Sequence, residues 1–328
     1  MKYRKFSNLN WNVSEIGLGC WQIGWCWGEE VTDTSARELL KKALDKGVNF
    51  FDTSDTYGDG RSERFLSELK KLTKEKIYIT TKLGRRVRGT NYPKGYKHKP
   101  MEEFVDRSLK NLNVECIDLL QLHCPPTEIC SQAETYDSID RLVQKGKIAY
   151  YGVSVWKVSD ALEAIKFKNV KSIQLVFNIF RHKPIENFLK EAKKKEVAVI
   201  ARGPLASGLL GGDMDENTVF AANDHRNYNI NGSAFDVGDT FSGVNFNKGL
   251  EAVVKLKEIL PKNFSLSDLA LKWILEHKEV TVVIPGATNK NQVSLNTNVS
   301  NLPSVSHLMK KIEKIYEEKI KADVHYRW

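Results

Sequence analysis

Eight short apolar runs recur along this chain, and each is followed by a segment whose apolar residues have helical spacing. The runs are nearly continuous in apolar residues, as expected of strands that are covered on both faces. In chain order they are 15–21 (EIGLGCW), 48–52 (VNFFD), 77–82 (IYITTK), 117–123 (IDLLQLH), 148–155 (IAYYGVSV), 172–178 (SIQLVFN), 197–202 (VAVIAR) and 281–285 (TVVIP). Eight strand-then-helix units in 328 residues predict an α/β fold, a (β/α)8 TIM barrel. A doubly wound sheet is the alternative.

Two further segments are added to this repeat. Residues 3–6 and 11–13, joined by a turn at 7–10, are predicted to form an N-terminal hairpin that closes the bottom of the barrel. A long loop after strand 7, residues 211–247, is rich in Gly, Asn and Asp and lacks a clear periodicity. Loops of this length are commonly functional, and barrels often bind phosphate groups in this region.

The helical segments show recognisable ends. The first is predicted at 35–47 with Gly47 as its C-cap, and the last is a lysine-rich helix at 304–321. No stretch of low complexity divides the chain, so residues 1–328 are expected to form a single domain.

Composition disfavours several classes of protein. With 41% hydrophobic residues the chain can bury a large core, yet no run approaches the ~18 uninterrupted apolar residues of a membrane span. The N-terminus MKYRKFSNLN lacks the apolar core of a signal peptide, so a cytoplasmic protein with no membrane partner is expected. The net charge of +9 is dispersed and is not interleaved with aromatic residues, which disfavours a nucleic-acid partner. The five cysteines match no zinc or redox spacing and are expected to be reduced.

Polar side chains stand where three consecutive predicted strands end. Asp52 closes the second run, with Tyr57 in the loop that follows it, and Lys82 and His123 close the third and fourth runs. Because catalytic groups of such barrels lie at the carboxyl ends of strands, these four side chains are predicted to meet at one rim. One Asp and one His are too few ligands for a metal ion, and Lys82 would repel it, so no metal is expected.

The four side chains suggest acid catalysis by a phenol. Free tyrosine has a pKa near ~10 and is a poor proton donor at neutral pH. The Lys82 ammonium is expected to lower the pKa of Tyr57, and Asp52 is expected to keep Lys82 charged. His123 is expected to donate a hydrogen bond to the substrate oxygen. A capped turn, a loop aromatic and a solvated strand end are the ordinary structural alternatives for these residues taken singly.

Five stretches carry a resemblance to a known family. They are GVNFFDTSDTYGDGRSE (47–63), IDLLQLH (117–123), GKIAYYGVS (146–154), GPLASGLL (203–210) and IPGATNKNQ (284–292). In this order they resemble the aldo-keto reductase superfamily nearly from end to end. The resemblance implies a barrel that binds a nicotinamide cofactor and exchanges hydride with a carbonyl carbon. It places the family's catalytic tetrad on Asp52, Tyr57, Lys82 and His123.

The resemblance also implies the cofactor contacts. They fall on Gly19, Trp21, Asp52, Ser154, Gln174, Arg202, Gly203, Pro204, Leu205, Ser207, Gly208, Leu210, Gly286, Asn289, Gln292 and Asn296. The nicotinamide amide is expected against Ser154 and Gln174, and the pyrophosphate along 203–210. Arg202 stands where many relatives have an aromatic ring that stacks on the nicotinamide, and a planar guanidinium can also stack. Val155 replaces a common Asn and removes one possible amide contact.

The adenosine end is expected at strand 8 and the helix after it. Relatives that prefer the phosphorylated cofactor often have arginines there, whereas this chain has Asn289 and Gln292 with Lys290 as the nearby cation. NADP(H) is favoured over NAD(H), with NAD(H) left open. The glycines of GLGCWQ (17–22) fail as a Rossmann fingerprint because a third glycine is missing.

The substrate pocket is expected to contain Trp21, Trp27 and Trp156, with Trp25 nearby. Their apolar ring faces suit aromatic aldehydes or sugar rings, and rim packing is the alternative for Trp25 and Trp27. The predicted function is NAD(P)H-dependent reduction of an aldehyde, ketone or sugar, with Tyr57 as general acid. The alternatives are a sugar or polyol dehydrogenase and a redox-sensing regulatory subunit, the latter disfavoured because no N-terminal extension precedes the barrel. The oligomeric state stays open.

Overall fold

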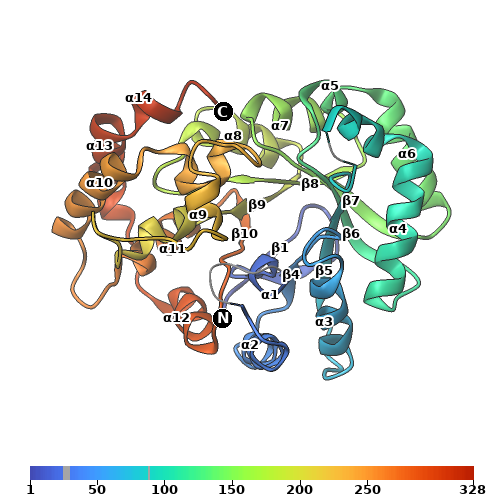
Figure 1. Cartoon of the computed structure of the whole chain (residues 1–328), viewed down its shortest axis with the longest axis horizontal. Coiled ribbons are helices and arrows are strands. Elements are labelled where there is room, and N and C mark those ends of the chain that lie inside the picture. The colour runs from blue at the N-terminus through green and yellow to red at the C-terminus, as the bar shows by residue number, and fades with distance from the viewer. Residues whose placement is uncertain (25–29, 88) are drawn as a thin grey trace.

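Eight parallel strands lie at the centre of the computed structural model, which describes residues 1–24, 30–87 and 89–328 (Figure 1). They are β3 (Leu18–Gly19), β4 (Phe50–Asp52), β5 (Tyr78–Leu83), β6 (Ile117–His123), β7 (Ile148–Ser154), β8 (Val170–Val176), β9 (Ala198–Arg202) and β10 (Val280–Val283). Each strand pairs in parallel with the next one along the chain. All eight predicted runs are therefore strands of one sheet.

The two ends of this sheet meet and nearly close it. Parallel bridges join Ile16 to Val283 and Gly19 to Gly286, and the Gly17 amide donates to the Val283 carbonyl at 2.8 Å. An open doubly wound sheet would reverse its strand order at a switch point, which this sheet does not. The predicted (β/α)8 barrel is confirmed.

Helices surround the sheet (Figure 1). The longer ones are α2 (Asp33–Asp45), α3 (Arg61–Lys70), α4 (His98–Leu112), α6 (Ala133–Gln144), α7 (Val158–Ala164), α8 (Phe188–Lys194), α10 (Phe246–Glu258), α11 (Leu266–Glu276), α12 (Lys290–Asn298) and α13 (Met309–Lys319). The short ones are α1 (Trp21–Gly24), α5 (Thr127–Cys130), α9 (His225–Tyr228) and α14 (Lys321–Val324). Each of the amphipathic helices buries one apolar stripe against the strands.

Local sequence sets where the first helix begins and ends. The Thr32 side chain accepts a hydrogen bond from the Ser35 amide, which fixes the N-terminus of α2. Lys46 is the C-cap, and Gly47 follows it with φ at +82°, a value that glycine adopts without strain. The predicted helix is confirmed, beginning two residues before 35 and with Gly47 just outside it.

The predicted hairpin consists of β1 (Tyr3–Lys5) and β2 (Asn12–Ser14), which pair in antiparallel register. Its aromatic rings face the first residues of two barrel strands. The Phe6 ring lies 5.6 Å from the Phe50 ring, and the Trp11 ring lies 4.5 Å from the Tyr78 ring. Because these contacts are at the amino ends of the strands, the hairpin closes the bottom of the barrel, as predicted.

The last helix begins later than predicted. Residues 304–308 do not join it, and α13 starts at Met309. The Ser304 hydroxyl accepts from the Ser306 amide at 3.2 Å, and residues 306–308 form a 3-10 turn. Such a side-chain bond to the backbone competes with the start of a helix.

The long loop after β9 has little regular structure but firm anchors. It contains α9 and 3-10 turns that include η4 (Val237–Asp239) and η5 (Phe241–Gly243). The Trp328 indole nitrogen donates to Asp236 Oδ1 at 3.0 Å, and the Arg181 guanidinium lies 3.9 Å from the Trp328 ring centroid. The C-terminal residue therefore holds this loop against the barrel.

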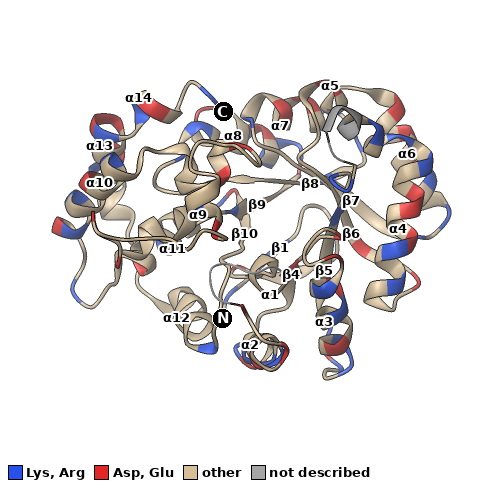
Figure 2. Ribbon diagram, viewed as in Figure 1, with Lys and Arg blue, Asp and Glu red and all other residues tan. Residues whose placement is uncertain are grey.

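Charged side chains lie mainly on the outer helices (Figure 2). Lysines, arginines, aspartates and glutamates alternate along α4, α6 and α13, and some of them form exposed pairs such as Lys314–Glu318 at 3.7 Å. The positive charge is thus dispersed over the helical layer. Within the described ranges, none of the helices combines the length and the apolar character needed to cross a bilayer.

Candidate active site

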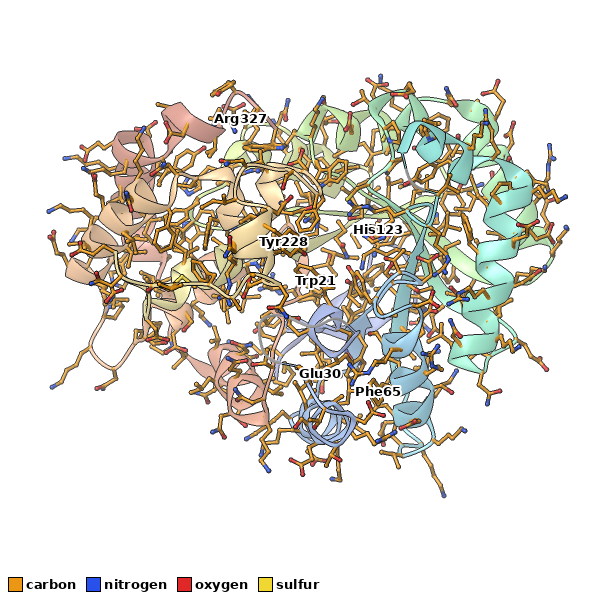
Figure 3. The ribbon with its side chains drawn as sticks, viewed as in Figure 1. Trp21, Glu30, Phe65, His123, Tyr228 and Arg327 are labelled. Atoms are coloured by element: carbon orange, nitrogen blue, oxygen red, sulfur yellow. The ribbon has the colours of Figure 1, made fainter. Side chains whose placement is uncertain are left out.

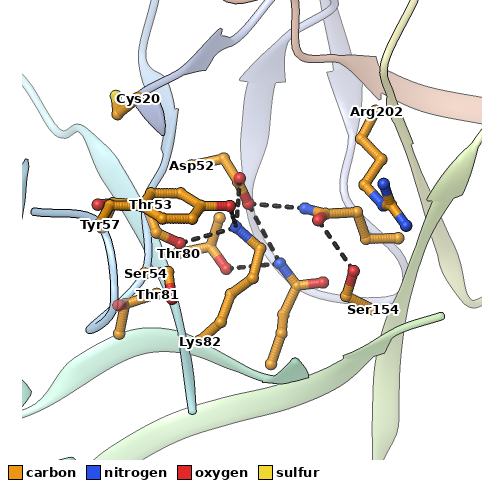
Figure 4. Close-up of polar contacts among 12 residues, drawn as sticks. Cys20, Asp52, Thr53, Ser54, Tyr57, Thr80, Thr81, Lys82, Ser154 and Arg202 are labelled. Carbon is orange, nitrogen blue, oxygen red and sulfur yellow. Dashed lines mark hydrogen bonds and ion pairs between the residues drawn. The ribbon is translucent and has the colours of Figure 1, made fainter. Parts of the chain in front are cut away.

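A buried ion pair lies at the carboxyl ends of β4 and β5. Lys82 Nζ donates to Asp52 Oδ1 at 2.5 Å, to the Thr53 carbonyl at 2.8 Å and to the Tyr57 hydroxyl at 3.3 Å (Figure 4). The exposed fractions of Lys82 and Asp52 are 1% and 3%. Parallel neighbours in register bring these side chains together, because Asp52 pairs with Thr80 and Lys82 follows two residues later on the same strand face. The predicted proximity of Asp52, Tyr57 and Lys82 is confirmed by these distances.

Asp52 is held on its other oxygen by two amides. Gln174 Nε2 donates to Asp52 Oδ2 at 2.7 Å, and Gln121 Nε2 donates to the same oxygen at 3.3 Å. Gln121 Nε2 also donates to Thr80 Oγ1 at 3.0 Å. Every one of these side chains is buried. A buried carboxylate is costly unless it is paired and hydrogen-bonded, and this one has both kinds of partner.

The electrostatics of the pair differ in part from the prediction. Burial opposes the charge on Lys82, but Asp52 and Tyr57 outweigh it and raise the pKa of Lys82 above its usual value. Burial also raises the pKa of Tyr57, and the Lys82 ammonium, which lowers it, does not offset the burial. The expectation of a lowered pKa for Tyr57 is therefore wrong, although the lysine acts with the predicted sign.

His123 ends β6 and lies beside the phenol. The His123 and Tyr57 rings are 6.0 Å apart between centroids and nearly perpendicular. Burial, and then the positive charges of Arg85, Lys82 and Arg202, lower the pKa of His123 well below its usual range. His123 is therefore a neutral imidazole, which can donate or accept one hydrogen bond at each ring nitrogen according to its tautomer.

The strand ends next to His123 carry the two residues that were predicted to bind the nicotinamide amide. The Ser154 hydroxyl donates to Gln174 Oε1 at 3.1 Å, so these two side chains form a chain that ends on Asp52 (Figure 4). Cys124 Sγ lies 3.6 Å from Ser154 Oγ. Ser154 and Gln174 thus present adjacent polar groups at the rim, as the prediction for a carboxamide site requires.

Arg202, at the end of β9, is tied to the long loop. Its Nη1 donates to Asp239 Oδ1, and its Nη2 donates to the Val155 carbonyl at 3.3 Å. The Trp156 indole nitrogen donates to the second Asp239 oxygen at 2.9 Å. Arg202 Nε is buried and has no hydrogen-bond partner in the described part of the chain. Such orphaned donors are rare in folded proteins and are typical of ligand sites.

A cavity of about 1770 Å³ opens over these residues. A site for one drug-sized molecule has ~300–1,000 Å³, so this cavity has room for an extended cofactor together with a substrate. All but one of the predicted cofactor residues line it, namely Gly19, Trp21, Asp52, Ser154, Gln174, Arg202, Gly203, Pro204, Leu205, Ser207, Gly208, Gly286, Asn289, Gln292 and Asn296. Leu210 instead packs in the hydrophobic core. The donor set and the room both fit a dinucleotide.

The far end of the cavity is the start of α12. The Asn289 side chain accepts from the amides of Asn291 and Gln292, which makes it the N-cap of this helix. Helix N-termini favour anions. Lys290, the predicted nearby cation, pairs with Glu38 of α2 at 3.2 Å. The side chain expected to meet a 2′-phosphate therefore already has an acidic neighbour.

Two of the three predicted substrate-pocket tryptophans lie in the cavity wall. Trp21 and Trp156 line it, and the Trp21 ring lies 5.2 Å from the His225 ring and 6.4 Å from the Phe235 ring of the long loop. Trp21 and Tyr228, a further residue of that loop, are labelled in Figure 3. Trp27, like Trp25, lies outside the described residues. The rings of the loop and of α1 thus form an aromatic side to the cavity.

Several residues of the site were not predicted. Gln121 interrupts the apolar run IDLLQLH. A polar residue inside an otherwise buried strand indicates a buried hydrogen-bonding role, so this position carries a signal in the sequence. Asp239 lies in a loop without periodicity, where no local pattern distinguishes it from its neighbours. Ser54 contacts His123 and lies between Asp52 and Asp55. No local pattern distinguishes this serine from an ordinary turn residue.

Comparisons with known proteins agree with this geometry. A model of the aldo/keto reductase family matches residues 15–317. The uncharacterized oxidoreductase YqkF of Bacillus subtilis (strain 168) is 28% identical over 326 residues, which cover 98% of this chain and 95% of the relative. A probable voltage-gated potassium channel subunit beta of Oryza sativa subsp. japonica is also 28% identical, over 344 residues that cover 100% of both chains.

Two further relatives bear on the chemistry. The aldo-keto reductase yakc of Schizosaccharomyces pombe, whose name specifies NADP(+), is 26% identical over 285 residues, covering 84% of this chain and 81% of the relative. The structure of the glycerol dehydrogenase AKR11B4 from Gluconobacter oxydans superposes with a TM-score of 0.79 at 27% identity, covering 97% of this chain and 96% of that one. This chain belongs to the aldo/keto reductase family, whose members are oxidoreductases that act on carbonyl or alcohol groups.

Proposed function

We propose that this protein is an NAD(P)H-dependent reductase of aldehydes, ketones or open-chain sugars. The observation that carries the proposal is the position of Lys82 Nζ, which lies 2.5 Å from Asp52 Oδ1 and 3.3 Å from the Tyr57 hydroxyl, two groups whose residues line a large cavity. A phenol beside a buried ammonium suits a site where negative charge develops on a carbonyl oxygen.

The proton step falls to Tyr57. Its raised pKa keeps the phenol protonated at neutral pH, so the acid is present when the substrate arrives. As the carbonyl oxygen gains negative charge, Tyr57 gives up its proton, and the ammonium 3.3 Å away stabilises the tyrosinate that forms. His123 orients the carbonyl oxygen through a hydrogen bond from its ring. The nicotinamide cofactor, when bound, supplies the hydride.

The remaining residues hold the cofactor. Ser154 and Gln174 would receive the nicotinamide amide, and Arg202 would lie against its ring. The turn at 203–210, in which Gly208 has φ at +95°, would meet the pyrophosphate. The N-terminus of α12, with Gly286 and Asn296 beside it, would hold the adenosine end.

NADP(H) is the favoured cofactor. The presence of Lys290 at the first turn of α12 and the NADP(+) in the name of one relative support this preference. The Lys290–Glu38 pair reduces it, because the glutamate competes with a 2′-phosphate for the same ammonium. If the 2′-phosphate is recognised by its charge, the Kd for NADPH divided by the Kd for NADH is expected to be well below one. This ratio should rise with salt concentration, because salt screens the charge.

Two other functions use the same site. Oxidation of a polyol is favoured by the similarity to a glycerol dehydrogenase structure. A redox-sensing regulatory subunit is favoured by the similarity to a potassium channel subunit beta. Reduction, oxidation and redox sensing all require cofactor binding. They differ in whether substrate is turned over and in the direction of hydride transfer.

The test follows NADPH and NADH absorbance with a panel from 4-nitrobenzaldehyde to free sugars. Tyr57→Phe is compared with Tyr150→Phe, which removes the hydroxyl of a β7 tyrosine that packs on Trp11 at the barrel bottom. We expect turnover in the native protein and in Tyr150→Phe, and a collapse in Tyr57→Phe. If NADPH binds but neither reduction nor oxidation of alcohols is detected, the reductase proposal fails and the sensing function takes its place.

A further inference from the structure

Ser54 connects His123 to a second buried carboxyl group. Ser54 Oγ lies 3.1 Å from His123 Nδ1 and 3.2 Å from Asp55 Oδ1. Thr56 also contacts this hydroxyl, through its amide at 3.3 Å and its own hydroxyl at 3.0 Å. The exposed fractions of Ser54 and Asp55 are both 0%. None of the proposed catalytic or cofactor roles uses Ser54 or Asp55.

A hydroxyl has one proton to donate and two lone pairs to accept with. Ser54 therefore cannot donate to His123 Nδ1 and to Asp55 Oδ1 at the same time. When it donates to the carboxylate, its contact with Nδ1 is a hydrogen bond only if Nδ1 carries the proton and donates. When it donates to Nδ1, its contact with Asp55 is a hydrogen bond only if Asp55 is protonated and donates. The protonation state of Asp55 and the tautomer of His123 are thus coupled through one rotatable O–H bond.

The surroundings of Asp55 allow both states near neutral pH. Its Oδ2 atom is buried and has no hydrogen-bond partner in the parts of the chain that are described, which penalises the ionised form. Burial and then the Glu63 carboxylate of α3 raise the pKa of Asp55 to about 7, against the lowering effects of Arg86, the Ser54 hydrogen bond and Arg107 of α4.

The two arginines near Asp55 are engaged mainly elsewhere. Arg86 donates to the Asp55 carbonyl at 3.0 Å and to Asp59 Oδ1 at 2.6 Å, and Arg107 donates to Asp59 Oδ1 at 2.7 Å. Asp59 thus receives the short contacts of both guanidinium groups. This arrangement leaves the Asp55 carboxyl facing Ser54 and the nearby Glu63.

We propose that Asp55 is a positioning residue that acts through the Ser54 hydroxyl to set the tautomer of His123. With Asp55 protonated, Ser54 donates to Nδ1, so the ring proton is on Nε2 and that atom is a donor to a carbonyl oxygen. With Asp55 ionised, Ser54 donates to the carboxylate and accepts from Nδ1–H, so Nε2 carries a lone pair and cannot donate to the substrate oxygen. Because reduction and oxidation pass through the same transition state, the first state favours hydride transfer in both directions.

The switch concerns a tautomer and not the charge of His123. Burial, and then the positive charges of Arg85, Lys82 and Arg202, keep the ring neutral by lowering the pKa of His123. One proton leaves Asp55 for solvent as the pH rises, the Ser54 O–H turns, and the proton of the neutral imidazole exchanges from Nε2 to Nδ1. No net charge is gained by the ring in either state. The consequence for turnover depends on the proposed oxidoreductase function, whereas the tautomer change does not.

The experiment measures the tautomer directly by two-bond ¹H–¹⁵N NMR correlation of the full chain between pH 5.5 and 8.5, with and without NADP(+). The His123 signals are assigned by their loss in His123→Gln. We expect Nε2–H at low pH and Nδ1–H at high pH, with a midpoint near the value of about 7 given by the Asp55 environment. In Asp55→Asn and Ser54→Ala, this pH dependence is expected to disappear.

Asp59→Asn is the matched control, because it removes a neighbouring carboxylate that binds Arg86 and Arg107 but does not contact Ser54. It should retain the tautomer change. A His123 ring that keeps one tautomer across the range would overturn the proposal, and so would a change that persists in both Asp55→Asn and Ser54→Ala. Because the NMR measurement of the tautomer needs no turnover, its outcome is independent of the reductase assay.

Kinetics then test the consequence for turnover. The rates of hydride transfer to a carbonyl and from an alcohol are each expected to fall about 10-fold as Asp55 ionises, because a donor to their common oxyanion-like transition state is lost. Both profiles should lose this inflection in Ser54→Ala and keep it in Asp59→Asn. A native profile without the inflection, or one that keeps it in Ser54→Ala, would refute the link to turnover.

Discussion

Gln174 Nε2 donates a 2.7 Å hydrogen bond to Asp52 Oδ2, across 122 residues of sequence. Gln174 also accepts from Ser154 Oγ at 3.1 Å, so the residues proposed to hold the nicotinamide amide end on the carboxylate that holds Lys82. The residues proposed to bind the cofactor and the ammonium proposed to assist Tyr57 therefore share one chain of hydrogen bonds. The two functions should respond together to changes at Gln174.

Replacing Gln174 and Gln121 in turn separates these roles. Both amides donate to Asp52 Oδ2, but of the two only Gln174 lines the cavity. A lost hydrogen bond to a charged group costs ~1.5–3 kcal/mol, or about 10- to 100-fold in kcat if it acts on the transition state. We expect Gln174→Leu to lower kcat and raise the cofactor Kd, and Gln121→Leu to lower kcat with little change in Kd. Equal effects on Kd would contradict a direct contact between Gln174 and the cofactor.

Breaking the buried Lys82–Asp52 pair should destabilise the fold. Removal of one partner leaves an uncompensated buried charge, which costs ~3–5 kcal/mol. We expect Lys82→Met and Asp52→Asn each to lower the free energy of unfolding by this amount in urea titrations. The double variant should lose less than the sum of the two, because neither charge is then left alone. All three should be inactive as reductases, and additive losses would show that the pair is not coupled.

The parts of the site that were predicted from sequence lie at the ends of regular strands. Asp52, Lys82 and His123 end runs whose apolar pattern is plain, so their common rim follows from the barrel. The hydrogen bond from Gln174 to Asp52 depends on how the barrel closes, which no local pattern fixes. Asp239 could not be predicted, since it lies in a loop whose shape depends on distant anchors such as Trp328.

The electrostatics show the same limit. The effect of Lys82 on Tyr57 was predicted with the right sign from residue types alone. The net direction was wrong because burial, which depends on the packing of the whole rim, is the larger effect. The sequence indicates which charged side chains lie close together, whereas their degree of burial, and so the cost of removing them from water, depends on the folded structure.

Stability should fall in acid because of His182. Its ring is stacked between Trp273 and Tyr316, with centroids 4.7 and 3.9 Å away, and burial lowers the pKa of His182 to about 3. Above the unfolded value of ~6.5 both states are neutral, so the contribution of this residue is fully present there. As the pH falls from ~6.5 towards about 3, the unfolded chain binds a proton that the folded chain does not, and stability is lost.

At pH 5 this loss amounts to about 2 kcal/mol relative to pH 7.5. Urea unfolding at the two pH values should therefore show a smaller difference in His182→Phe than in the native protein, whatever the absolute stability of the variant. His307→Phe changes an exposed histidine and should leave the difference unchanged. A pH dependence that is the same in all three proteins would exclude His182 as a source.

Glu38 should limit the preference for NADPH. Its carboxylate lies 3.2 Å from Lys290 Nζ, and both side chains are more than half exposed. Exposed pairs are worth ~0.2–1 kcal/mol, so Glu38→Gln is expected to lower the Kd for NADPH by a factor of up to about five. The Kd for NADH should not change, since it has no 2′-phosphate. Glu68→Gln, which removes a glutamate paired with Arg37, is the control. An equal gain for both cofactors would show that Lys290 does not meet the phosphate.

Asp239 should couple the long loop to the cofactor site. Its carboxylate accepts from Arg202 and from the Trp156 indole at 2.9 Å, and Phe241 of the same loop donates to Ser207 Oγ at 3.1 Å. In Asp239→Ala the buried Arg202 loses its counter-charge and the loop loses its link to two strand ends. We expect faster proteolysis within 211–247 and a rise of about 10-fold or more in the cofactor Kd.

Limited proteolysis with and without NADPH measures the first effect, and fluorescence titration measures the second. Glu216→Gln changes an exposed side chain of the same loop and should match the native protein in both. In the native protein NADPH is expected to slow cleavage, because Arg202, against which the nicotinamide is proposed to lie, is the residue that Asp239 holds. Cleavage of Asp239→Ala at the native rate would show that the loop is held by its other anchors alone, and a normal Kd would show that Arg202 keeps its position without Asp239.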